Sequence, residues 1–434
     1  MIRYLKVAGK RICPSVAVYL LYIIYYISGY NGAGHNYIQA ILFALWNLTA
    51  FWEDRASYQR TILCVPNLFL CGFVLFYFFS SIIVGDFIYT LEYLARYLML
   101  YGCFTQFLYY KNRNKEGEMK AILGTSLLTY LLFSAGAIIF YIQNPSAARI
   151  LASNRNAFDT IAIGGGYAIA FGAAILLVGL FEMLLDGRFH TTVFRKILCL
   201  LTVALLMLLI VKTESTITLI AAIAGLMLAI GNRGAYGKET EKRGNYTRKI
   251  IGTVLIALIL MLILLNINSI GKWLMDSTFD SIDRVLPRRF YRIGEKLYYF
   301  GSENVTENYV DTRLNTVKMS WETFLQHPLI GVGYQCGNVF KELSAHGVGT
   351  HSMVFDILAQ HGIIGSMLLF GFLFTAIKRV HSYIRCNGYI GALLIMMALN
   401  PFSNFHGFFV VLVILPMFGY ICDNRMNRQL EEKV

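Results

Sequence analysis

Long apolar runs divide the chain, and they constrain its fold more than any other feature. A helix that crosses the hydrocarbon core of a bilayer needs roughly 20 mostly apolar residues, and the chain holds twelve runs near that length. Only 15% of its 434 residues are charged, whereas about a quarter would be charged in a soluble protein. We therefore predict an all-α polytopic membrane protein with about 12 transmembrane helices, at residues 12–28, 34–52, 61–84, 87–110, 121–142, 158–185, 194–211, 215–231, 250–270, 352–377, 388–404 and 406–422.

Basic residues favour one side of these spans. If the N-terminus is cytoplasmic, most of the 38 Lys and Arg residues fall in the segments that face the cytoplasm, and the short connections on the other side hold few. This asymmetry follows the positive-inside rule. The net charge of +13 is therefore interpreted as a topology signal rather than a nucleic-acid-binding surface, and both termini are expected to be cytoplasmic.

One connection on the outer side is much longer than the others. It covers residues 271–351 and is rich in aromatic side chains such as Trp273 and Trp321, which a solvated linker would lack. We predict three parts: a transmembrane bundle of about nine spans at 1–270, an extracytoplasmic loop domain carrying the site at 271–351, and the last three spans with a cytoplasmic tail at 352–434.

Two helices are predicted inside this outer segment. The first is amphipathic and basic, with cations at helical spacing: Arg284, Arg288, Arg289, Arg292 and Lys296. It fits anchoring to lipid headgroups, and equally a clamp in which several guanidiniums share a diphosphate. The second is expected to begin with Asp311 as its N-cap and to end near Gln326 before Pro328. Arg313 lies beside its apolar face.

A glycine-rich stretch and two histidines follow. Pro328 to Tyr334 reads PLIGVGY, then come His346 and the pair His351–Ser352, and Gly362 and Gly365 lie in the next span. Each feature alone has an ordinary structural explanation, because interfacial histidines and glycines at tight turns are common.

Taken together, these motifs resemble the O-antigen ligase and polymerase family, the Wzy-type integral membrane glycosyltransferases. The resemblance rests on Pro328–Gly333, on His351–Ser352 and on the Gly362–Gly365 repeat. Arg313 and Trp321 occupy the places of the family's arginine and aromatic residue before the Pro-Leu-Gly stretch. A weaker match is the Asn-rich turn at residues 152–157, which contains Arg155. One departure is at residues 212–216, where Lys212 stands in place of the family's arginine.

The resemblance implies glycosyl transfer from an undecaprenyl-diphosphate-linked oligosaccharide at the outer face of the bacterial cytoplasmic (inner) membrane. It assigns His351 to the acceptor hydroxyl and Arg313 to the diphosphate as the catalytic pair. The proposed diphosphate ligands are Arg288, Arg289, Arg292, Arg155 and Lys212, and the proposed glycan contacts are Tyr334, His346 and Trp321. No metal and no cofactor are expected. The expected partners are membrane lipid and, among proteins, a flippase and a chain-length regulator, with no nucleic acid.

Three functions stay open at this point. A polymerase of O-antigen, capsule or exopolysaccharide is the reading we favour, and a ligase that transfers the glycan to lipid A-core or to protein is the alternative. A transporter or flippase is the third, with Asp356 and the Glu92/Arg96 pair as its candidate intramembrane charges.

Overall fold

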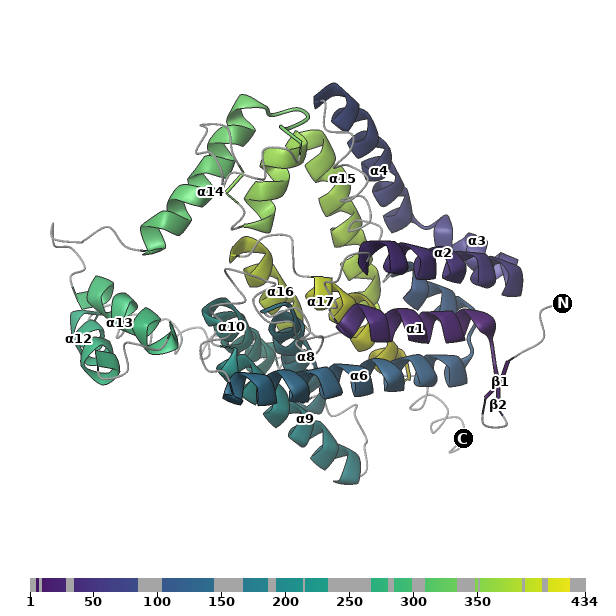
Figure 1. The fold of residues 1–434 in the computed structure, drawn as a ribbon, viewed down its shortest axis with the longest axis horizontal. Helices are drawn as coiled ribbons and strands as arrows, with labels where there is room; N and C mark the ends of the chain where they lie inside the picture. The colour runs from purple at the N-terminus through teal and green to yellow at the C-terminus, as the bar shows by residue number, and fades with distance from the viewer. Residues whose placement is uncertain are drawn as a thin grey trace, which may run out of the picture.

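The computed structural model describes residues 5–7, 10–28, 35–84, 104–143, 167–185, 193–213, 215–232, 267–279, 285–298, 309–333, 348–349, 352–384, 387–399 and 405–421. Most of these residues are helical (Figure 1). The labelled elements are β1 (Leu5–Val7), β2 (Lys10–Ile12), α1 (Pro14–Ser28), α2 (His35–Glu53), α3 (Arg55–Ile62), α4 (Val65–Val84), α6 (Glu116–Gln143), α8 (Tyr167–Leu185), α9 (Val193–Lys212), α10 (Thr216–Asn232), α12 (Ile267–Thr278), α13 (Val285–Tyr298), α14 (Tyr309–Gln326), α15 (Met353–Ile384), α16 (Gly388–Leu399), α17 (Phe405–Phe409) and η5 (Val410–Ile414).

The predicted all-α class holds for the bundle, with one addition at the N-terminus. Strands β1 and β2 form a small antiparallel hairpin in which Leu5 pairs with Ile12. It leads directly into α1, so it precedes the first apolar run rather than replacing any predicted helix.

The predicted count of twelve spans is not confirmed. Within the described ranges, three helices are long and apolar enough to cross a membrane: Val65–Ile83, Glu116–Gln143 and Met353–Ile384. Seven further apolar helices are shorter, at 10–17 residues. Most of two predicted spans, 87–110 and 250–270, lies outside the part of the chain that the structure describes.

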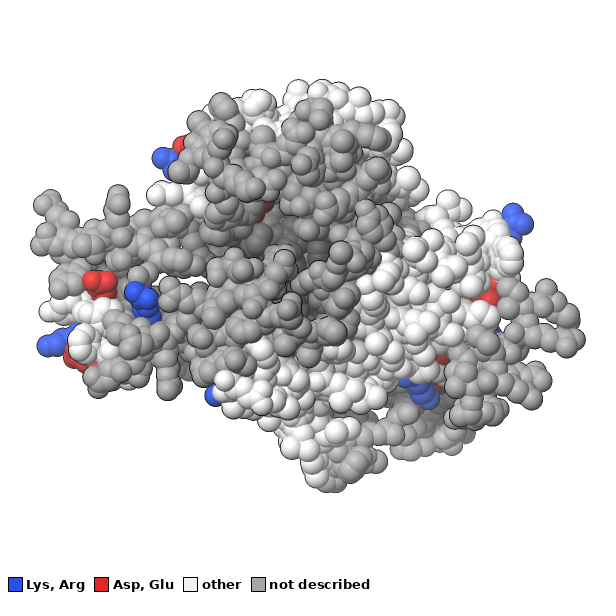
Figure 2. Space-filling model, in the orientation of Figure 1, with Lys and Arg blue, Asp and Glu red and all other residues white. Residues whose placement is uncertain are grey.

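Apolar side chains cover the outer faces of several helices. Ile83 of α4, Leu132 of α6 and Leu201 of α9 are each more than 60% exposed, and α2 carries further exposed leucines and isoleucines. An amphipathic helix in a water-soluble protein would turn such residues inward. On the face shown in Figure 2, the described charged side chains lie toward the edges. This distribution fits a surface in contact with lipid.

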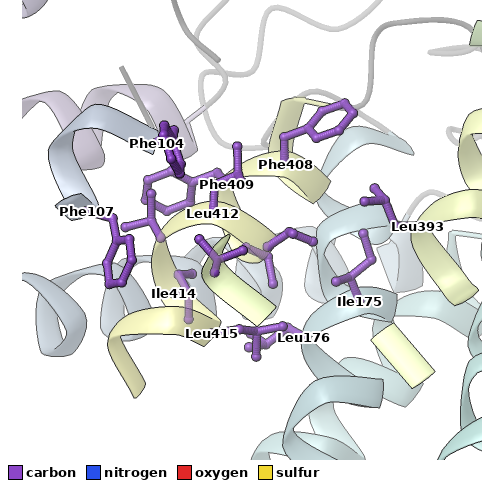
Figure 3. Close-up of a cluster of buried hydrophobic side chains, with 14 of the residues drawn as sticks. Phe104, Phe107, Ile175, Leu176, Leu393, Phe408, Phe409, Leu412, Ile414 and Leu415 are labelled. Atoms are coloured by element: carbon purple, nitrogen blue, oxygen red, sulfur yellow. The ribbon is translucent and has the colours of Figure 1, made fainter. Parts of the chain in front are cut away.

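The C-terminal helix forms the centre of the core. Residues 407–414 of α17 and η5 are buried on every side, as expected of a helix that is hydrophobic all round. Figure 3 shows Phe104 and Phe107 on one flank of this helix and Ile175, Leu176 and Leu393 on the other. Helix α8, which carries Ile175 and Leu176, contacts α9, α10 and α16 in addition to α17. It therefore lies at the centre of one half of the bundle.

A buried ion network closes one end of the bundle. Arg113 lies between Glu53 of α2, at 2.6 Å, and Glu118 of α6, at 3.2 Å, and Glu53 also accepts hydrogen bonds from the backbone and hydroxyl of Ser15. Burial disfavours the charge on Arg113, yet Tyr109, Glu118 and its other neighbours hold the pKa of this guanidinium above its ordinary value. Two segments predicted to be cytoplasmic, 53–60 and 111–120, therefore meet at the start of the first predicted span.

The two ends of the bundle carry different parts of the chain. The hairpin β1–β2, and with it the start of α1 and the ion network, lies on the right in Figure 1, whereas α12 and α13 lie on the far left. This separation agrees with the predicted alternation of the spans. Which side of the membrane each end faces stays a prediction.

Candidate active site

The glycine-rich stretch packs against a break in α15. Helix α14 ends at Gln326, and the chain turns through 327–330 into residues 331–333, which have no regular secondary structure. Beside it, α15 is interrupted at Gly362, whose φ of 60° and ψ of −168° are not helical. The two predicted motifs, Pro328–Gly333 and the Gly362 region, therefore meet in space.

Backbone hydrogen bonds join these two segments. A break in a helix leaves N–H and C=O groups without partners inside the helix, and such groups are costly to bury unpaired. Here the N–H groups of Ile363 and Ile364 donate to the carbonyls of Pro328 and Leu329, at 2.7 and 3.3 Å. In return, the N–H groups of residues 332 and 333 donate to the carbonyls of residues 359 and 360, at 3.0 Å each.

Two positions in this exchange require glycine. A Cβ on Gly331 would overlap the backbone carbonyl of Gln360, and a Cβ on Gly362 would overlap that of Leu329. Both glycines also have positive φ, of 71° and 60°, and the conformation of Gly362 is one that side-chain-bearing residues hardly adopt. The glycines therefore let two backbones touch at the break.

Helix α14 is joined to the start of α15 by a buried polar cluster. The hydroxyl of Ser320 donates to Oδ1 of Asp356 at 2.8 Å and accepts from the backbone N–H of Gly349 at 2.8 Å. Oδ2 of Asp356 accepts from the backbone N–H of Ser352 at 3.1 Å. Ser320, Ser352 and Asp356 are 0–4% exposed. The carboxylate also lies in the first turn of α15, where a negative charge is favourable.

Residues 348 and 349 are held from two further directions. Val348 packs with Val332 and Ala359 in a small buried cluster. A Cβ on Gly349 would collide with the backbone of Thr316 in α14, so the chain passes very close to that helix. Val332, α14 and α15 thus contact Val348, Gly349 and Ser352.

His351 falls between these fixed points. It lies outside the described residues, as do Arg155, Tyr334 and His346, and its described neighbours are Gly349 and Ser352. Arg313 is in α14, seven residues before Ser320, and two helical turns place it on the same face of the helix. That face also carries Thr316. The backbone of the proposed arginine is therefore on the side of α14 that meets residues 348–352.

The aromatic residue of the predicted motif also reaches this region. The ring of Trp321 makes an edge contact with Phe355 of α15, with ring centroids 6.0 Å apart, and also contacts Phe324. It is 41% exposed, so part of the indole surface faces outward. A large, partly exposed ring beside a polar cluster can stack on an apolar face of a ligand.

The predicted amphipathic helix is confirmed as α13, but it does not join this site. Helix α13 packs on α12 at a glycine contact, where a Cβ on Gly294 would lie 2.7 Å from the carbonyl oxygen of Gly271. Figure 1 shows the α12–α13 pair to the side of α14 and α15. Arg288 is exposed, and the side chains of Arg289 and Arg292 lie outside the described part.

Lys212 lies apart as well. It ends α9 and is exposed, and α9 packs on α8 and α6 rather than on α14. Beyond it, the hydroxyl groups of Ser215 and Thr218 share a hydrogen bond of 2.6 Å at the start of α10. Among the described residues, no group of three or more His, Cys, Asp and Glu side chains is arranged to hold a metal ion.

No sequence pattern singles out Ser320 or Thr316, because a hydroxyl residue inside an amphipathic helix has no distinguishing spacing. Asp356 did give a signal, as an acid in an apolar span, but it was considered only as a transport charge. The structure gives it hydrogen-bond partners at the helix start. His361 was also overlooked, and it is buried between the rings of Phe73 and Tyr77 of α4.

The fold and this site together define a polytopic helical membrane protein with a broken late span and a folded segment before it. A family model described as O-antigen ligase matches residues 199–370, a range that runs from α9 into α15 and includes the site. The match supports the O-antigen ligase and polymerase family, in agreement with the resemblance drawn from the motifs. Members of this family are glycosyltransferase-like ligases and polymerases. No curated protein matches the chain.

Proposed function

We propose that the protein polymerises a bacterial surface polysaccharide: an O-antigen, a capsule or an exopolysaccharide. It would transfer glycan from undecaprenyl diphosphate to the non-reducing end of another lipid-linked repeat unit at the outer face of the inner membrane. The observation that carries the proposal is the hydrogen-bonded cluster in which Ser320 of α14 and Asp356 of α15 hold Gly349 and Ser352, the residues that flank position 351. That cluster lies within the region matched by the family model.

Arg313 is proposed to stabilise the leaving group. When the bond between the anomeric carbon and the diphosphate oxygen breaks, that oxygen gains negative charge. A guanidinium positioned beforehand stabilises such charge, and its planar donors suit bidentate contact with phosphate oxygens. Lysine would supply the charge without the fork.

His351 is proposed to act on the acceptor. A sugar hydroxyl is a poor nucleophile at neutral pH, so a base within hydrogen-bond reach is needed to take its proton as the oxygen attacks. Histidine is the side chain best suited to this at physiological pH. The acceptor oxygen then bonds to the anomeric carbon, the diphosphate leaves with the electron pair, and the imidazole carries the proton. Direct displacement of this kind inverts the anomeric centre and needs no metal.

The other predicted ligands are proposed in supporting roles. The arginines at 288, 289 and 292 lie on an amphipathic helix, and they would gather the lipid diphosphate at headgroup depth. Arg155 and Lys212 would add positive charge at the outer ends of their spans. Trp321, with its partly exposed ring, would contact the glycan with Tyr334 and His346. A flippase and a chain-length regulator would be the protein partners.

Ligation is the alternative, and the description of the matching family favours it. A ligase would use the same donor chemistry but would transfer the glycan to lipid A-core or to protein. The acceptor therefore distinguishes the two functions, while Arg313 and His351 would serve either one. We place polymerase first because the family to which the motifs point includes many polymerases of capsule, exopolysaccharide and O-antigen.

The test uses His351→Ala and Arg313→Lys in the full-length protein, expressed in cells that lack the endogenous copy. Loss of long chains with accumulation of single lipid-linked repeats supports a polymerase. Long lipid-linked chains that stay unattached would instead indicate a ligase. Matched controls are His327→Ala and Lys318→Ala, because both side chains are exposed and lie on or just after α14. Wild-type glycan in both site variants would refute the assignment of these residues.

A further inference from the structure

The two residues that bracket position 351 are attached to the same carboxylate. Gly349 is held through the hydroxyl of Ser320, whose proton goes to Oδ1 of Asp356, and Ser352 is held directly by Oδ2. Position 351 lies between these two anchored residues in the sequence. Hydrogen bonds that hold the chain on both sides of a reactive group can position that group.

We propose that Ser320 and Asp356 are positioning residues for His351 in the transfer reaction. The inference rests on the proposed function, since it assigns the pair a role toward the same histidine. Neither residue is proposed to touch the substrate. Their effect on the reaction would be to hold the imidazole-bearing backbone at a fixed distance from α14, and thus from Arg313 on the same helix face.

The direction of each hydrogen bond explains why these residue types are needed. The Ser320 hydroxyl oxygen accepts a hydrogen bond from the N–H of Gly349, so its own proton needs a separate acceptor, which Oδ1 of Asp356 provides. The backbone N–H of Ser352 needs an acceptor as well. An ionised carboxylate offers acceptors on both oxygens, whereas an amide offers an acceptor on one side and a donor on the other.

Asp356→Asn is therefore a sharp perturbation that keeps the side-chain volume. If its oxygen stays toward Ser352, the amide nitrogen faces the Ser320 hydroxyl. That hydroxyl must then turn to its remaining acceptor, the carbonyl of Thr316 at 3.4 Å, which is at the limit of a hydrogen bond. The link between α14 and α15 is weakened while both helices keep their packing.

The chain supplies a matched control in Glu182. This buried carboxylate of α8 accepts the backbone N–H groups of Asn387 at 2.9 Å and Gly388 at 2.8 Å, at the start of α16. Glu182→Gln removes the same kind of helix-start contact in a part of the bundle away from the site. A purely structural role for Asp356 predicts that both variants behave alike.

The first measurement does not depend on activity. Hydrogen–deuterium exchange of the full-length protein in lipid nanodiscs reports the backbone N–H groups of Gly349 and Ser352. We expect faster exchange at Gly349 in Asp356→Asn and in Ser320→Ala, with wild-type protection there in Glu182→Gln. Ser320→Thr keeps the hydroxyl and should restore protection at Gly349. Unchanged exchange at these amides in all variants would overturn the inference.

The second measurement is the rate of transfer from a lipid-diphosphate-linked oligosaccharide, per folded protein. We expect kcat to fall on the order of 10- to 100-fold in Asp356→Asn, as displaced catalytic groups do, with KM for the donor little changed. Glu182→Gln should keep its kcat. If activity in Asp356→Asn falls only with the folded fraction, the positioning role is wrong, although the proposed function stands. If His351→Ala keeps full activity, the proposed function itself fails.

Discussion

Replacing Gly362 with alanine tests the backbone exchange that shapes the site. At φ 60° and ψ −168°, a residue with a side chain pays about 1–3 kcal/mol of backbone strain. The new Cβ would also overlap the Leu329 carbonyl, so the backbone segment at Leu329 and the break in α15 must move apart. Their separation endangers the hydrogen bonds donated by Ile363 and Ile364, which contribute about 0.5–1.5 kcal/mol each. We expect Gly362→Ala to lower the free energy of unfolding by about 2–6 kcal/mol.

The assay is an equilibrium unfolding titration of the purified protein in mixed SDS micelles. Gly124→Ala in α6 is the matched control, because a Cβ there meets nothing within 4 Å. Alanine also favours a helix over glycine by up to about 1 kcal/mol, so this variant should be neutral or more stable. A Gly362→Ala protein as stable as the wild type would show that the break does not depend on a glycine conformation, and the account of the motif would be wrong.

Two further predictions concern the opposite end of the bundle. Glu53→Gln should cost up to about 3–5 kcal/mol of unfolding free energy, because it removes the nearer of the two carboxylates that neutralise the buried Arg113 charge and leaves only Glu118; Glu322→Gln, in an exposed pair, should cost at most about 1 kcal/mol in the same titration. Asp54 caps α3 through the N–H of Ser57; partial burial opposes its ionisation, but the hydrogen bonds from Ser57 lower the pKa of this carboxyl below 3.8. Since the folded-state pKa is depressed, Asp54 contributes stability above pH 3.8 and loses it as the pH falls through the folded-state pKa. Asp54→Ala should therefore be about 1 kcal/mol less stable than wild type at neutral pH, with the difference shrinking in acid. An equal difference at all pH values would contradict this, and Asp54→Asn should keep the cap.

Periodicity and charge predicted where many helices lie in the sequence, but not the residues at which each one begins and ends. The basic amphipathic pattern from Arg284 to Lys296 predicted α13, which covers Val285–Tyr298. Gln326 was predicted as the end of α14 and is its last residue. The start was wrong by three residues, because Tyr309, Val310 and Asp311 are already helical and so Asp311 is not the N-cap. Helix ends depend on local capping and packing, and a sequence pattern limits them only loosely.

The tertiary contacts of the site could not be predicted in this way. Nothing in the spacing of Ser320 and Asp356, 36 residues apart, indicates that they meet, since no periodic pattern relates a residue of one helix to a residue so far along the chain in another. A shared residue type likewise gives no information on how the arginines of α13 and Arg313 of α14 lie relative to one another.

The family signature in this chain describes a scaffold more than a reaction. Pro328–Gly333 and Gly362 are two halves of one backbone exchange, and their glycines are explained by contact between main chains without any substrate. Val332 and Ala359 of the exchange pack against Val348. Val348 directly precedes Gly349, which is bonded to Ser320 of the proposed positioning pair. Enzymes with different acceptors can share such a motif, because it holds Val348 and Gly349 in place. Other residues would then contact the glycan. It follows that exchanging Tyr334, His346 or Trp321 should alter acceptor preference while the folded state persists, whereas a change at Gly331 or Gly362 should reduce folding and transfer to every acceptor together.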